Sequence, residues 1–96
     1  MNSAKIQKNV RSIGMAAFIN YYEILSKDIS KDDKIKVLMN QYDYDGASMR
    51  VSFFNQLAES KLYLTEALML IEKAKRINKS TCLKAKEYRE KIENIQ

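Results

Sequence analysis

The side chains that could do chemistry are few, and they do not favour catalysis. The chain has 96 residues, with no histidine and one cysteine, Cys82, so it lacks the usual general base and any Cys–His pair. Carboxylates are paired at Asp32 with Asp33 and at Asp43 with Asp45, where helix capping and turn formation explain them. We therefore expect no enzyme, no metal site and no cofactor.

The segment from Gln41 to Ser52 falls in register with the calcium loop of EF-hands. Asp43, Asp45 and Gly46 stand at matching positions. Gln41 and Ser52, however, replace the leading acid and the closing bidentate glutamate, which are the ligands that count most. We expect no calcium site here.

The outward side chains of the helix predicted over residues 46–58 are of types that contact DNA bases. Ser, Asn, Gln and Arg hydrogen-bond to base edges, and Arg binds guanine with two hydrogen bonds. The candidate base-contacting residues are Ser48, Met49, Arg50, Ser52, Asn55 and Gln56. They make the helix over 46–58 the first candidate for reading DNA.

Together with a helix predicted over 31–40, this helix resembles a helix-turn-helix from Ser30 to Leu57. The resemblance is architectural, and it implies that the N-terminal part of the second helix enters the major groove. It also implies a small DNA-binding protein, such as a transcriptional or phage or mobile-element regulator. Two features depart from the pattern: the turn over 41–45 is long, and Asp43 and Asp45 place negative charge near the phosphates.

Basic residues exceed acidic ones by 17 to 12, which gives a net charge of +5 and a pI near 9.3. Such an excess favours an anionic partner, and DNA is the first candidate. The candidate phosphate contacts are Lys61, Lys73, Lys75, Arg76 and Lys79, with Lys5, Lys8 and Arg11 near the N-terminus. The alternative is a solvated face, because cations near the end of a helix are favoured by its dipole without any ligand.

Apolar residues recur every three or four positions almost throughout, which predicts an all-α fold. With no proline and two glycines, we expect a single domain over 1–96, a compact bundle of four or five helices. The predicted helices cover about 5–25, 31–40, 46–58, 66–76 and 81–94, and the third and fourth could also form one rod. Ser30, Asp45, Thr65 and Ser80 are the expected helix caps. The last helix carries its apolar stripe on Cys82, Ala85, Tyr88, Ile92 and Ile95.

A second hypothesis is a non-catalytic interaction module, an adaptor or inhibitor that binds a protein partner or forms a homodimer. Adjacent aromatic residues on a helix point in different directions, so we expect Tyr22 and Phe53 to be partly exposed and to contact that partner. A lone cysteine and the absence of any long apolar run favour a cytoplasmic protein without membrane contact.

Overall fold

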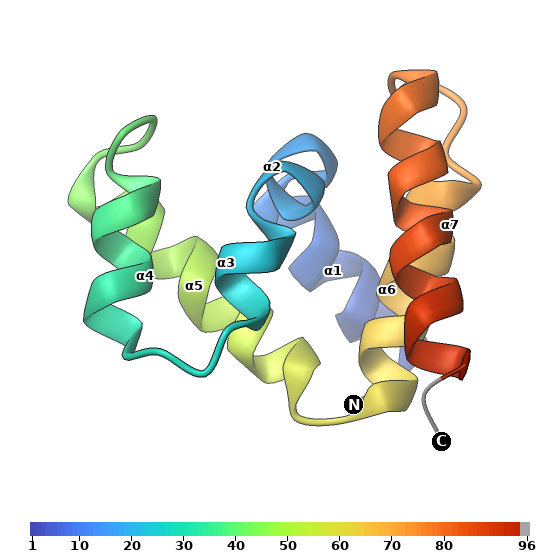
Figure 1. Cartoon of the computed structure of the whole chain (residues 1–96), viewed down its shortest axis with the longest axis horizontal. Coiled ribbons are helices and arrows are strands. Elements are labelled where there is room, and N and C mark those ends of the chain that lie inside the picture. Colours follow the sequence, from blue (N-terminus) through green and yellow to red (C-terminus); the bar gives the residue numbers. More distant parts are fainter. Residues whose placement is uncertain (95–96) are drawn as a thin grey trace.

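The computed structural model describes residues 1–94, and within them the chain forms seven α-helices and no strand (Figure 1). They are α1 (Ser3–Ile13), α2 (Met15–Asn20), α3 (Tyr22–Ser26), α4 (Lys31–Leu38), α5 (Tyr44–Ala58), α6 (Lys61–Glu72) and α7 (Lys79–Asn94). The predicted all-α class is confirmed. The helix count exceeds the expected four or five because the segment predicted as one helix over 5–25 forms three short ones. Ile95, expected on the last apolar stripe, lies outside the described residues.

Gly14 ends the first helix. Its φ of 90° lies in the region that favours glycine, and its N–H donates to the carbonyl of Val10 at 2.9 Å to close α1. A second break follows at Tyr21, between α2 and α3. The apolar spacing runs through both breaks because Ile13, Phe18 and Leu25 face the same core from α1, α2 and α3.

Two side-chain caps set the start of α4 and of α5. Ser30 caps α4 as predicted, since its hydroxyl accepts a hydrogen bond from the N–H of Asp33 at 3.1 Å. The cap of α5 is Asp43 rather than Asp45, because the Asp43 carboxylate accepts from the N–H of Gly46 at 2.7 Å. The helix predicted over 46–58 therefore begins earlier, at Tyr44.

The last two helices also begin earlier than predicted. The Ser60 hydroxyl accepts from the N–H of Leu62 at 3.2 Å, so α6 starts at Lys61 and Thr65 lies inside it. This start also separates α5 from α6, and the alternative of one continuous rod is wrong. Before α7, Asn78 rather than Ser80 caps the helix, because the Asn78 side-chain oxygen accepts from the Ser80 N–H at 2.7 Å.

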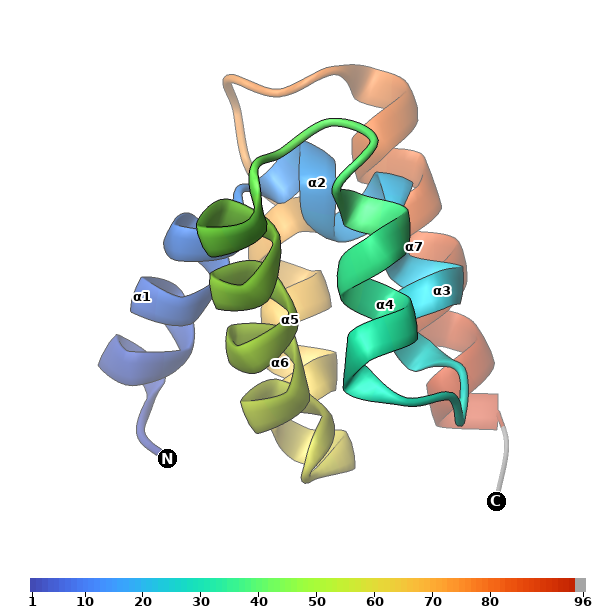
Figure 2. The same ribbon diagram turned by 90° about the vertical axis from the view of Figure 1, so that its left-hand side faces the viewer.

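The central element is α5. Figure 2 shows α5 between α1 and α4, with α6 and α7 behind them. Its buried residues Ala47, Val51, Phe54 and Leu57 are those that the helical spacing predicts. Met39 falls within the helix predicted over 31–40, but α4 ends at Leu38 and Met39, which follows that end, is 47% exposed.

An aromatic cluster joins α2, α3, α5 and α7. The ring centroid of Phe54 lies 5.1 Å from that of Phe18 and 5.9 Å from that of Tyr22. Tyr22 in turn stacks on Tyr88, with centroids 4.2 Å apart and an interplanar angle of 18°. Aromatic contacts of this kind add to the free energy of burial. The cluster anchors α7 to the rest of the core.

Candidate nucleic-acid interface

The polar side chains of α5 are less available than the helix-turn-helix resemblance implies. Ser48, Ser52 and Asn55 are half-buried, and Met49 is the exposed member of the predicted base-contacting set. Gln56 is engaged inside the protein, where its side-chain oxygen accepts from the amide of Asn9 at 3.1 Å. The central position of α5 explains this, because neighbouring helices cover most of its circumference.

Arg50 holds two helices together. Its Nε donates to the carbonyl of Ile13, the last residue of α1, at 3.0 Å, and its Nη1 donates to the carbonyl of Gly46 at 3.1 Å. The guanidinium also lies 3.7 Å from the ring centroid of Tyr42, a cation–π contact. The Arg50 guanidinium, the group that would bind guanine, is thus hydrogen-bonded to the C-terminal end of α1.

We expect Arg50→Ala to lower the free energy of unfolding by about 1.5–3 kcal/mol, the range for hydrogen bonds to a charged group. Urea denaturation measures the loss. Met49→Ala, one position away and exposed, is the control and should change stability by less than about 0.5 kcal/mol. An unchanged unfolding midpoint for Arg50→Ala would contradict the structural role and favour an arginine that projects toward a ligand.

The exposed cations gather where α6 passes into α7. From residue 73 to residue 86, here called the basic segment, the chain has six basic residues and no acidic one. All six are exposed: Lys73, Lys75, Arg76, Lys79, Lys84 and Lys86. The sequence prediction named the first four. The signal for Lys84 and Lys86 was the acid-free run between Glu72 and Glu87.

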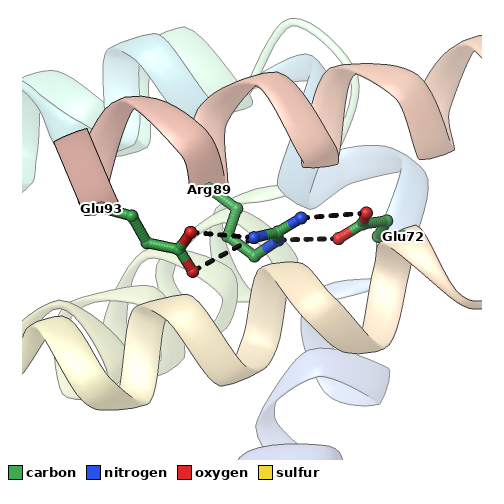
Figure 3. Close-up of polar contacts among 3 residues, drawn as sticks. All are labelled: Glu72, Arg89 and Glu93. Carbon is green, nitrogen blue, oxygen red and sulfur yellow. Dashed lines mark hydrogen bonds and ion pairs between the residues drawn. The ribbon is translucent and has the colours of Figure 1, made fainter.

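An ion-pair network on α6 and α7 borders the basic segment (Figure 3). Arg89 donates to both carboxylate oxygens of Glu72, at 2.8 and 3.1 Å, and to those of Glu93, at 3.0 and 3.1 Å. The hydrogen bonds from Arg89 lower the pKa of Glu72, and the charges of Lys86 and Lys73 add to this effect. Lys73 follows Glu72 in the chain and Lys86 stands three residues before Arg89, so the two ends of the basic segment flank this ion pair.

The network has a defined pH dependence. Because the pKa of Glu72 is lower in the folded chain than in the unfolded one, the pair stabilises the fold above the ordinary glutamate pKa. That contribution disappears as the pH falls through the lowered value. The same hydrogen bonds raise the pKa of Arg89, so the pair is ionised at neutral pH. Arg89 is therefore engaged in holding α7 on α6.

Other predicted phosphate contacts lie at different places. Arg11 lines the same surface hollow as Ala74, so it adjoins the basic segment. Lys61 is the first residue of α6 and Lys73 follows its last, and the 12 residues of α6 span about 18 Å. Lys61 thus lies at the opposite end of α6 from the basic segment.

The two aromatic residues proposed to contact a partner differ in exposure. Tyr22 is 8% exposed, so the expectation of partial exposure is wrong, and its burial raises the pKa of its hydroxyl. The physical reason is the stacking on Tyr88, which covers the ring that helix geometry alone places at the edge. Phe53 is half-buried and packs against the core.

Asp43 and Cys82, the remaining residues considered for metal binding or reactivity, both form hydrogen bonds to the backbone. The carboxylate of Asp43 caps α5, and the thiol of Cys82, half-exposed rather than buried, donates to the carbonyl of Ala74 at 3.6 Å. Over residues 1–94, no group of three or more His, Cys, Asp and Glu side chains is placed to hold a metal ion. In the same stretch, no helix has the length and apolar character needed to cross a bilayer.

Comparisons with protein-family models, with curated proteins and with solved structures return no match. A proposal for function therefore depends on the geometry and charge of this chain's own residues.

Proposed function

We propose that the chain is a small nucleic-acid-binding protein that contacts the phosphate backbone through the basic segment. The observation that supports this is the set of six exposed cations over residues 73–86 without an acidic residue among them. Lysine and arginine side chains bind phosphates and release the counterions condensed on DNA, which supplies most of the affinity in sequence-independent binding. The proposal assigns affinity to α6 and α7 rather than to α5.

The placement of the cations supports a continuous phosphate-contacting surface. Lys73 follows the end of α6, Lys75 and Arg76 lie in the connection, and Lys79 begins α7. Lys79 and Lys86 are seven residues apart and so share one face of α7. None of these side chains forms an ion pair within the described residues, which leaves their charges available to a phosphate.

Base reading by α5 is a separate proposal. Within the described residues, the members of the predicted set whose side chains form no hydrogen bond inside the protein are Ser48, Met49, Ser52 and Asn55. A role as a transcriptional or mobile-element regulator requires this second contact, because phosphate contacts carry no sequence information.

The test is fluorescence anisotropy of a labelled random duplex titrated with the protein between about 50 and 200 mM salt. We expect binding whose affinity falls steeply with salt, with a logarithmic slope of about −0.9 for each phosphate contacted. Absence of binding at the lowest salt would overturn the proposal.

The second candidate is the interaction module. Two exposed apolar side chains flank the connection between α4 and α5: Met39, and Tyr44 at 58% exposure. Met49 is also exposed, on the second turn of α5. Exposed aromatic and methionine side chains are enriched in protein interfaces. This corner, rather than Tyr22, is the surface on which a protein partner would be sought if the DNA titration fails.

A further inference from the structure

A cleft lies between α7 and the α2–α3 segment, and Lys84 is the one cation of the basic segment in its lining. Its volume is about 320 Å³, at the lower end of the range for small-molecule sites. Residues of α2 and α3 form one wall, and residues from the first three turns of α7 form the other. The size suits a small metabolite better than a nucleotide.

The apolar side chains at the base of the cleft are fixed by packing. Ile19 and Tyr88 are both buried, and Ile24 beside them is half-buried. Tyr88 cannot tilt easily because its ring stacks on Tyr22, which in turn packs against Phe54. The base of the cleft is therefore rigid, which lowers the cost of ordering it around a ligand.

The two walls carry opposite charges. Glu23 of α3 lines one side and Lys84 of α7 lines the other, and among the described residues they form no ion pair. The polar groups of Asn20, Ser80 and Thr81 complete the lining. A carboxylate and an ammonium group on opposite walls of one cleft match a ligand that carries both charges.

We propose that this cleft binds a small zwitterion, a free α-amino acid with an apolar side chain. Its ammonium group pairs with Glu23, and its carboxylate pairs with Lys84 and accepts hydrogen bonds from the Thr81 or Ser80 hydroxyl. Its side chain packs on Ile24, the partly exposed apolar residue beside Ile19 and Tyr88. A purely anionic ligand is disfavoured by Glu23, and a purely cationic one by Lys84.

The inference does not rest on nucleic-acid binding. Lys84 belongs to the basic segment, but Glu23 does not, and no DNA enters the experiment. Its outcome and that of the DNA titration are thus independent.

The test is a titration of the ¹⁵N-labelled full chain with leucine or phenylalanine, followed by amide chemical shifts. We expect saturable shifts at Ile19, Ile24, Thr81 and Lys84. N-acetylleucine lacks the ammonium charge and leucinamide lacks the carboxylate, so each should bind about tenfold or more weakly than leucine. No saturable shift at about 10 mM amino acid, or equal affinity for the blocked derivatives, would overturn the proposal.

Variants of the two charged residues separate ligand recognition from structure. Both side chains are exposed, so their substitution should leave the fold intact. Glu23→Gln should remove the preference for leucine over N-acetylleucine, and Lys84→Gln the preference over leucinamide. The double variant E23K/K84E should regain leucine binding in the reversed orientation. If both single variants still bind leucine more tightly than N-acetylleucine and leucinamide, Glu23 and Lys84 do not recognise the two charges and the proposal is contradicted.

Discussion

Replacing Phe54 by alanine is expected to destabilise the fold by about 3–5 kcal/mol. The ring is fully buried at the centre of α5 and contacts the rings of Phe18 and Tyr22. Its removal leaves a cavity among four helices that cannot collapse without moving the aromatic cluster. Since a domain of this size has about 5–15 kcal/mol in total, the melting temperature should fall by at least about 12 °C.

Leu62→Ala is the matched control for this substitution. Leu62 is a large apolar side chain in the neighbouring helix, but it is 79% exposed. Its truncation should change the free energy of unfolding by less than about 0.5 kcal/mol. Thermal unfolding followed by circular dichroism compares the two, and similar losses would contradict the placement of α5 at the centre of the fold.

The sequence is most informative where burial alone decides the position of a residue. Val51, Phe54 and Leu57 are spaced by three residues, and burying them requires one face of one helix. The capping role of Ser30 is similarly predictable, because a serine three residues before an acidic residue is a local capping signal. Its hydroxyl accepts from the backbone N–H of Asp33, so no distant residue is needed.

Helix boundaries are harder to predict because several residues offer the same local signal. Ser60 and Thr65 can both cap a helix, as can Asp43 and Asp45, and tertiary packing selects between them. Gly14 is a different case. The core-facing spacing continues across it, so nothing in the periodicity indicates that the chain changes direction there.

In the candidate nucleic-acid interface, too, one part is predictable from the sequence and another is not. The excess of cations over 73–86 can be counted in the sequence, and helix ends and connections are exposed, so its availability is predictable. The position of Arg50 is not, because its partner Ile13 lies 37 residues away and contributes only a backbone carbonyl. Residue type alone predicts base contact for Arg50, whereas the fold uses it to join α1 to α5.

Removing three cations from the basic segment is expected to weaken DNA binding strongly. The triple variant K73Q/K75Q/R76Q should weaken DNA binding at least about tenfold near 0.1 M salt, because three phosphate contacts are lost. All three side chains are exposed, so the melting temperature should stay close to that of the unmodified chain.

A control with the same change in net charge is available. K27Q/K31Q/K36Q also removes three positive charges from exposed positions, in a part of the chain that carries Asp28, Asp32 and Asp33. If the location of the charge matters, this variant should retain most of the affinity. Equal losses in the two variants would indicate that only overall charge attracts DNA.

The most direct measurement is the dependence of DNA affinity on salt for the unmodified chain and the two triple variants in one series of anisotropy titrations. We predict that the logarithmic slope becomes shallower by about 2.7 for K73Q/K75Q/R76Q, which is about 0.9 for each phosphate contact, and changes little for K27Q/K31Q/K36Q. Identical slopes for all three proteins, or no binding at low salt by the unmodified chain, would contradict a phosphate-binding role for the basic segment.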